Sequence, residues 1–364
     1  MDYTLPSAPG TSLALPVIDG VFFADNSTLT NFVECNRKGE YRIIHRREFN
    51  STAWALEYGR RMHKALELRY TGSNVLLGSA GVTDQMQQLL ADEWANKGAE
   101  PDGEWRTLDN ACATVAKYNK EYPTETFNVL TTHDDTIACE LAFALPLTTF
   151  ELTTPITTVD LVTKEFKVVT RLPVFYTGRI DLITREADGT ILVTDHKTSS
   201  VGGAGLFDEY FTGGQMKGYV WAGRQLTGEN VLGARINVIG CRPPTKTIAC
   251  NTFFERQIVY FDDSHIEEWK QNTILLIGDM LHDLQRGNFP MRTTACKHRF
   301  GRCTYYNVCQ LPLENREMVL YSGEYRDVTW DPTADEQTLE KKPVVTSPNI
   351  PRDALDSIRS FIDG

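Results

Sequence analysis

Apolar residues recur every three or four positions in several parts of the chain, a spacing that gathers them on one face of an α-helix. Over residues 51–70 this face carries Tyr58, Met62 and Leu66. The basic residues that are expected to turn away from it are Arg60, Arg61 and Lys64. The same spacing predicts further helices over residues 83–96, 107–120, 213–226 and 264–286.

Two of these helices begin with residues that suit a helix N-terminus. Thr83 is a candidate N-cap, because its hydroxyl oxygen can accept a hydrogen bond from a free backbone N–H of the first turn. Ser264 and Glu267 form a capping-box pattern, and Gly287 follows the predicted end of the same helix.

Shorter segments rich in Val, Ile and Leu predict β-strands at residues 138–145, 174–184, 190–197, 234–241 and 253–261. The sequence Asp188-Gly189 is typical of a tight turn, so the second and third strands are expected to form a hairpin. The resulting order is helix, three strands, helix, strand. This order predicts an α/β domain with a central mixed sheet flanked by helices, and the helices within about residues 72–125 form an insertion ahead of the sheet.

The chain is expected to have three parts. Residues 1–27 contain proline and glycine without clear periodicity and predict an N-terminal arm packed over the domain. Residues 28–312 form the main domain. Residues 313–364 are polar and contain several prolines, which predicts a loosely attached tail.

Composition narrows the class of protein. Of the 364 residues 41% are hydrophobic, enough for a sizeable core. No apolar run reaches the roughly 18 residues needed to cross a bilayer, and the first residues lack the basic start of a secretory signal. We therefore expect a cytoplasmic protein without membrane contact. The net charge of −11 argues against a protein that coats nucleic acid by bulk electrostatics.

The most informative pattern is Gly178-x-x-Asp181 followed, across the predicted hairpin, by Asp195-His196-Lys197. Asp195 and Lys197 project from one face of a strand, and Asp181 can reach that face from the neighbouring strand. Carboxylates hold Mg²⁺ or Mn²⁺, and a lysine beside them can orient a metal-activated water. The alternative is an exposed, charged hairpin face. Both strands are otherwise apolar, however, and buried acids need a partner or a metal.

With these residues, the sequence resembles the RecB-like branch of the PD-(D/E)xK nucleases from about residue 28 to residue 312. Four motifs occur in the family's order: Gly59 with His63, Asp181, Asp195 with Lys197, and Gln215 with Tyr219. The resemblance implies a restriction-endonuclease-like core and metal-dependent cleavage of DNA.

The resemblance also implies roles for single residues. The catalytic residues are Asp181, Asp195 and Lys197. The metal ligands are His63, Asp181, Asp195 and the backbone carbonyl of His196. The substrate-binding residues are Gln215 and Tyr219. Taken singly, His63, Gln215 and Tyr219 are better explained by packing, so their joint order with the hairpin motif carries the assignment.

Two residues near these motifs are treated separately. Glu140 begins a predicted strand just before the hairpin, where the family often has a glutamate, and its role stays open. The side chain of His196 is expected to point away from Asp195 and Lys197, because neighbouring residues of a strand face opposite ways.

Eight cysteines in a chain without an export signal are expected to be thiols or metal ligands. Cys296, Cys303 and Cys309 crowd into 14 residues, as thiolates that bind zinc or iron–sulfur clusters do. The resemblance supplies Cys35 as a fourth ligand and implies a 4Fe-4S cluster that clamps the domain. The six-residue gap after Cys296 departs from the family spacing. Zinc bound by the three cysteines with Cys35 or His298 is the alternative.

Together these features predict a Mg²⁺- or Mn²⁺-dependent exonuclease that acts on single-stranded DNA or DNA ends in recombination, repair or replication. The sequence has no P-loop pattern, so a helicase or recombination protein would be a separate partner. By resemblance only, a phage or prophage origin is expected. The alternatives are a catalytically silent DNA-binding scaffold, a zinc-clamped endonuclease and a redox sensor.

Overall fold

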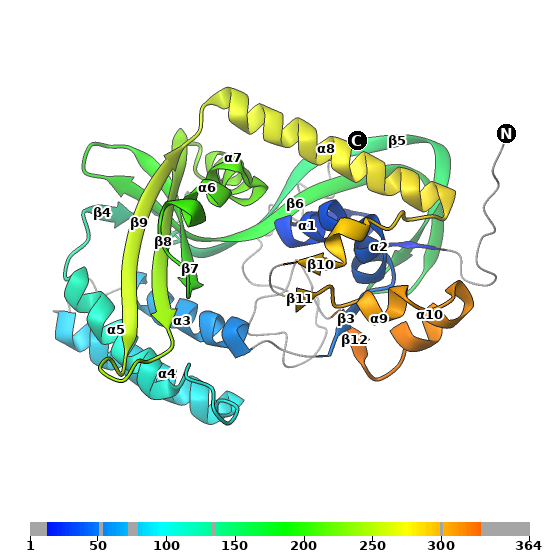
Figure 1. Ribbon diagram of the computed structural model, residues 1–364. Helices are drawn as coiled ribbons and strands as arrows, with labels where there is room; N and C mark the ends of the chain where they lie inside the picture. Colours follow the sequence, from blue (N-terminus) through cyan, green and yellow to red (C-terminus); the bar gives the residue numbers. More distant parts are fainter. Residues whose placement is uncertain (1–12, 51–53, 72–78, 133–135, 299–300, 329–364) are drawn as a thin grey trace. The chain divides into compact units, whose positions relative to one another are not determined.

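The elements of the chain are defined by a computed structural model that describes residues 13–50, 54–71, 79–132, 136–298 and 301–328. The chain divides into two units. The first comprises residues 1–51, 142–178 and 270–364, and the second comprises residues 52–141 and 179–269. Three elements contribute residues to both units: β5 (Cys139–Asp160), β6 (Phe166–Glu186) and α8 (Asp263–Arg286) (Figure 1).

A mixed sheet forms the centre of the second unit. β4 (Phe127–Val129) and β7 (Ile191–Ser199) pair with β6, and the sheet continues through β8 (Val231–Arg242) to β9 (Asn251–Tyr260). β7 runs antiparallel to β6 and parallel to β8, whereas β9 is antiparallel to β8. A parallel pair requires a crossover connection, which α6 (Ala204–Thr212) and α7 (Gly214–Thr227) provide.

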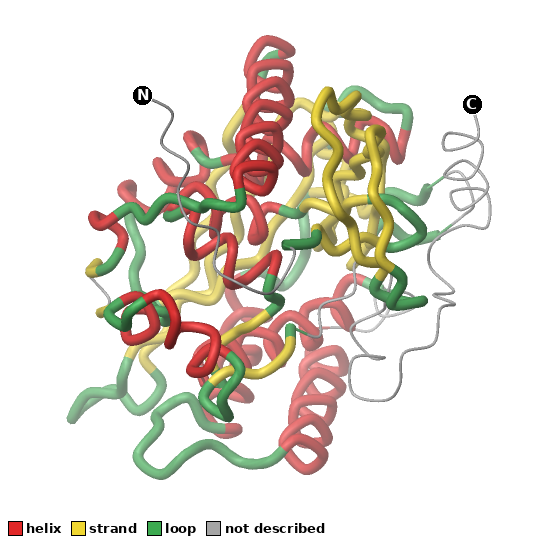
Figure 2. The backbone as a smooth tube through the Cα atoms, turned by 90° about the vertical axis from the view of Figure 1, so that its right-hand side faces the viewer, coloured by secondary structure: helices red, strands yellow, loops and turns green. Residues whose placement is uncertain are grey.

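Helices cover both faces of this sheet. α3 (Trp54–Tyr70), α4 (Ser79–Lys97) and α5 (Leu108–Glu121) share an apolar core with Leu182 of β6 and Ile239 of β8. The next residue, Ile183, points to the other face and lies near Gly223 of α7. A Cβ at Gly223 would come within 3.2 Å of Val193, so the glycine lets α7 approach the sheet closely. Figure 2 distinguishes these helices and strands along the backbone.

The first unit contains both ends of the described chain. β1 (Leu15–Val17) pairs in parallel with β5, and β2 (Phe22–Ala24) pairs in parallel with β6. β3 (Arg47–Phe49) is antiparallel to β12 (Tyr325–Asp327). Its further elements are α1 (Asn26–Glu34), α2 (Asn36–Gly39), the π-helix η1 (Glu40–Ile44), the 3-10 helix η3 (Thr293–Ala295), β10 (Lys297–His298), β11 (Gly301–Arg302), α9 (Tyr306–Cys309) and α10 (Leu313–Leu320). No helix in the described ranges is long and apolar enough to cross a membrane.

The predicted fold class is confirmed, because a mixed sheet lies between layers of helices. The predicted helices over 51–70, 107–120, 213–226 and 264–286 correspond to α3, α5, α7 and α8. The predicted hairpin is formed by β6 and β7, and Gly189 adopts a φ of 89° in its turn. That backbone conformation suits glycine, which has no Cβ to clash.

Three local predictions are wrong. α4 begins at Ser79, so Thr83 lies inside the helix, where its hydroxyl accepts a hydrogen bond from Asn119 at 2.8 Å. α8 begins at Asp263, and its cap is Asp262 rather than Ser264: the Asp262 carboxylate accepts from the backbone N–H of His265 at 3.0 Å. Arg61 does not face solvent. It is fully buried, with its guanidinium 4.2 Å from the ring centre of Trp94.

The described parts of the expected arm and tail belong to the first unit. Residues of the arm form β1 and β2, whose backbone groups pair with β5 and β6. Residues of the tail form α10 and β12, with Leu320 and Tyr325 buried. Neither segment shows the hydrophobic periodicity that would have predicted it. Residues 1–12 and 329–364 lie outside the described residues.

Candidate active site

The β6–β7 hairpin brings together the two acids and the lysine singled out from the sequence. Asp181 lies on β6, and its Oδ2 accepts a hydrogen bond from the backbone N–H of His196 at 2.6 Å. On β7 the Lys197 Nζ lies 2.9 Å from Asp195 Oδ2. Both carboxylates are buried. The same-face arrangement expected from the two-residue spacing is therefore present.

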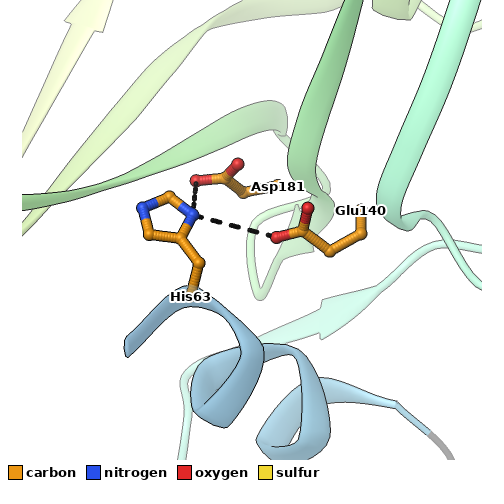
Figure 3. Close-up of side chains that lie close together, drawn as sticks. All are labelled: His63, Glu140 and Asp181. Carbon is orange, nitrogen blue, oxygen red and sulfur yellow. Dashed lines mark ion pairs between the residues drawn. The ribbon is translucent and has the colours of Figure 1, made fainter. Parts of the chain in front are cut away.

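His63 on α3 and Glu140 at the start of β5 complete a close group with Asp181 (Figure 3). The His63 Nδ1 lies 3.6 Å from Asp181 Oδ2 and 3.9 Å from Glu140 Oε1. Potential ligand atoms of these three residues lie within 4.8 Å of one another. Of the described residues, only these three meet the 4.8 Å limit, so Asp195 lies outside the group. The Asp195 Oδ2 lies next to Lys197 instead.

Gly59 explains how α3 reaches the sheet. A Cβ at this position would come within 2.8 Å of the Thr198 hydroxyl oxygen on β7, so a larger residue would require the helix or the Thr198 side chain to shift. His63 follows one helical turn later, on the part of α3 that faces Asp181. The Gly-x-x-x-His pattern therefore combines a close helix–strand approach with a ligand-type side chain.

Gln215 and Tyr219 face the same site from α7. The Gln215 Oε1 accepts a hydrogen bond from Lys197 Nζ at 3.2 Å, and its Nε2 donates to the Tyr219 hydroxyl at 3.1 Å. The same Nε2 lies 3.5 Å from Asp195 Oδ1. The one-turn spacing places both side chains on one face of the helix, as expected.

Burial and neighbouring charges shift the pKa values of the site. Burial raises the pKa of Asp181 to about 7, with His63 opposing the rise and Asp195 and Glu140 adding to it. Burial opposes protonation of His63, but the adjacent Asp181 and Glu140 raise its pKa to about 9. For Lys197, burial is outweighed by Asp195, and the pKa rises above its usual value. Without a metal, the group thus holds protons on His63 and Lys197, and partly on Asp181, near neutral pH.

The side chain of His196 points away from the acids, as predicted. Its Nδ1 lies 2.7 Å from the Asn237 side-chain nitrogen, and its ring stacks on Tyr70 with centroids 5.6 Å apart. Burial and nearby positive groups hold its pKa well below the usual value, so the ring is neutral.

Glu140 is the site residue whose role the sequence left open. It adopts a φ of 48°, a left-handed conformation that is uncommon for residues other than glycine. Arg179 lies near it, with Nη1 3.8 Å from Glu140 Oε2. The available sequence signal was an acid at the start of the strand before the hairpin. That signal predicted neither the left-handed backbone of Glu140 nor the position of its carboxylate beside His63.

The donor set suits a hard divalent cation. Carboxylate oxygens are the ligands preferred by Mg²⁺ and Mn²⁺, and an imidazole nitrogen is compatible with the latter. Three ligand-type groups converge, and two of them carry negative charge when deprotonated. This arrangement can hold a metal at the hairpin that also carries Lys197.

The four cysteines singled out from the sequence line one cavity of the first unit. Cys35 follows α1, and Cys296, Cys303 and Cys309 come from the segment after α8. The backbone N–H of Arg292 donates to the Cys35 Sγ at 3.3 Å. Burial raises the pKa of Cys309 to about 11. The remaining cysteines all belong to the second unit: Cys112, Cys139, Cys241 and Cys250.

Comparison with known proteins gives one family match. The model of the PD-(D/E)XK nuclease superfamily matches residues 26–310. A solved structure of a candidate exonuclease from Eubacterium rectale aligns with 14% identity and a TM-score of 0.39, over 83% of this chain and 93% of its own. The structure of SSO0001 aligns with 12% identity and a TM-score of 0.25, over 71% and 78%. Both scores are too low to support a conclusion. No curated protein matches the chain.

Proposed function

The chain belongs to the PD-(D/E)XK nuclease superfamily, and from this membership we propose that it is a Mg²⁺- or Mn²⁺-dependent deoxyribonuclease of the RecB-like branch. We propose residues 28–312 as the nuclease domain and DNA ends, single-stranded or broken, as the substrate of an exonuclease. One observation carries the proposal: α3, the β6–β7 hairpin and α7 direct His63, the two acids, Lys197 and Gln215 to one site.

The metal ligands in this proposal are His63, Asp181, Asp195 and the backbone carbonyl of His196, and we add Glu140 from its position beside His63. A bound divalent ion would lower the pKa of a water ligand and offset charge on the scissile phosphate. The close group of carboxylates and imidazole fits such an ion.

The role of Lys197 follows from its position and charge. Its ammonium group lies 2.9 Å from Asp195, which raises its pKa and keeps it protonated. It can donate a hydrogen bond to the attacking water and stabilise the negative charge that develops on the phosphate. Gln215 restrains the lysine through the 3.2 Å contact, and Gln215 and Tyr219 place the DNA strand.

We also propose the cellular setting from the family resemblance. The enzyme would act in the cytoplasm, in recombination, repair or replication, and would be encoded by a bacteriophage or prophage. A separate helicase or recombination protein would supply DNA ends. Because the net charge is −11, DNA affinity should depend on a few local basic residues and fall with salt with a slope of about three to five phosphate contacts.

We further propose that Cys35, Cys296, Cys303 and Cys309 bind a 4Fe-4S cluster. The proposal rests on the family resemblance and on the position of the four cysteines around one cavity. Zinc bound by the same residues is the alternative. A cluster would join the segment before the catalytic helix to the segment after α8.

The experiment that tests the proposed activity uses end-labelled substrates. Purified protein is incubated with linear and circular DNA, single- and double-stranded, with Mg²⁺, Mn²⁺ or a chelator. We expect metal-dependent loss of linear DNA, intact circles and no reaction with the chelator. Cleavage of circles would identify an endonuclease instead, and the absence of metal-dependent cleavage of every substrate would contradict the proposal.

A further inference from the structure

A buried hydrogen-bond network lies on the face of the sheet opposite to Asp195 and Lys197. It starts at His196, whose Nδ1 is 2.7 Å from the Asn237 side-chain nitrogen on β8. The same nitrogen donates to the Tyr118 hydroxyl at 2.8 Å. His196 and Asn237 are almost completely buried. On the face opposite to Asp195 and Lys197, β7 is therefore held by side chains that are not proposed as metal ligands.

Arg256 on β9 determines which way the Asn237 amide faces. The Arg256 Nε lies 3.1 Å from Asn237 Oδ1. A guanidinium only donates hydrogen bonds, so the amide atom that it contacts must be the oxygen. Arg256 is itself held by Glu125, which accepts from both terminal nitrogens at 2.6 and 3.0 Å. The amide nitrogen must then face His196.

This orientation fixes the hydrogen-bonding state of His196. Because the amide nitrogen donates, Nδ1 must accept, and the proton of the neutral ring lies on Nε2. The ring is stacked on Tyr70 at an angle of 12° and meets the His63 ring edge-on, with centroids 6.0 Å apart. One neighbour of His196 is thus a residue of the metal site.

We propose that Asn237 is a positioning residue: its amide holds the His196 ring and through it the segment of β7 that carries Asp195 and Lys197. The inference rests on the proposed nuclease function. The backbone N–H of His196 donates to Asp181 at 2.6 Å, so a shift of this residue would move that carboxylate as well. The Asn237 amide contacts the ring of His196, whereas the proposed ligand atom of that residue is its backbone carbonyl, so Asn237 acts through His196.

The expected loss of activity follows from how strongly metal sites depend on the residues that hydrogen-bond to the metal ligands. Loss of a hydrogen bond that orients a ligand typically lowers activity or metal affinity by about 10- to 100-fold. Positioning affects the reaction step more than the affinity for DNA. A defect at Asn237 should therefore lower kcat and leave KM for DNA nearly unchanged.

The central test is Asn237→Asp, which keeps the size of the side chain and the acceptor for Arg256 but removes the amide N–H groups that donate to His196 and to Tyr118. We expect kcat to fall about tenfold with KM for DNA within about twofold of the unmodified chain. In ¹⁵N-labelled protein, the His196 Nδ1 resonance should lose the signature of an unprotonated acceptor. Asn119→Asp is the matched control, since Asn119 is equally buried and bonds Arg69, Thr83 and Met86 but not His196.

A second pair of variants decides the question if Asn237→Asp does not fold. His196→Asn places an amide oxygen near the position of Nδ1 and should therefore lose less kcat than His196→Leu does. His196→Leu has no acceptor and should lose about tenfold. If both losses act through one hydrogen bond, the His196→Leu, Asn237→Asp double variant should be no slower than either single variant.

The outcomes separate this inference from the proposed activity. If folded Asn237→Asp protein keeps full kcat, or if Asn119→Asp loses as much, the positioning role is wrong. Equal activity of His196→Asn and His196→Leu would also overturn it. Lys197→Ala in the same assay reports on the proposed function itself, because its activity should fall at least about a hundredfold whatever the role of Asn237.

Discussion

At the residue scale, Glu140 is the side chain that the structure adds to the site. It lies beside His63 and Asp181, and its left-handed backbone is the kind of uncommon conformation that tends to persist at functional sites. We expect Glu140→Gln to weaken Mn²⁺ binding by at least about tenfold, because a neutral amide binds the ion more weakly than a carboxylate does. Calorimetric titration of the purified protein measures this affinity. Glu229→Gln, which changes an exposed acid on the same unit, should bind Mn²⁺ as the unmodified chain does. Equal affinity in both variants would remove Glu140 from the ligand set.

The pKa values of His63 and Asp181 predict a pH dependence of metal binding. Their pKa values in the metal-free protein are raised to about 9 and about 7. A metal ligand must be deprotonated, so binding near pH 7 should release protons and the affinity should rise between pH 6 and 9. Titrations in buffers of different ionisation enthalpy count the released protons. The raised pKa of His63 also means that its contribution to the stability of the metal-free protein is complete below pH 6.5 and is lost as the pH rises through about 9. An Mn²⁺ affinity that is constant over this range would contradict the assigned ligands.

At the element scale, the start of α8 gives a direct test of capping. The Asp262 carboxylate accepts from the backbone N–H of His265, whereas the Ser264 hydroxyl only donates to Asp262. Asp262→Ala should therefore lower the midpoint of urea unfolding, and Ser264→Ala should lower it by less. Urea unfolding followed by circular dichroism measures both. A larger loss from Ser264→Ala would restore Ser264 as the cap.

Hydrophobic periodicity predicted the elements that bury one clear face. α3, α5 and α7 and the β6–β7 hairpin have such faces, and these elements carry most of the site. The extent of β5 was missed, because every position between Leu147 and Ile156 is exposed or half-buried and the segment has no apolar alternation. The π-helix η1 was missed for another reason. It is a single turn, closed by the His45 backbone N–H donating to the Glu40 carbonyl, and so short a turn has no hydrophobic period that a sequence could reveal.

At the scale of the whole molecule, the proposed cluster would tie together segments that lie more than 250 residues apart in the sequence. The crowded trio could be seen in the sequence, whereas the link to Cys35 came from the family resemblance, because spacing alone cannot tell which distant cysteine approaches. The structure places all four around one cavity.

We expect protein purified without oxygen to contain iron and to be brown, and Cys35→Ser to lose iron and melt at a lower temperature. Cys112→Ser, which alters a cysteine of the second unit, should retain the metal. Full iron content in Cys35→Ser would rule out the four-cysteine site, and zinc in place of iron would identify the alternative.

The central claim is that the hairpin of β6 and β7 supports metal-dependent cleavage of DNA through Lys197. The most direct measurement compares the unmodified chain with Lys197→Ala on the same end-labelled linear DNA at saturating Mg²⁺, with DNA affinity measured in parallel. The variant should cleave at least about a hundredfold more slowly while binding DNA with similar affinity, because the lysine acts on the attacking water and the developing charge. Cleavage by Lys197→Ala within a few-fold of the unmodified rate would contradict the account.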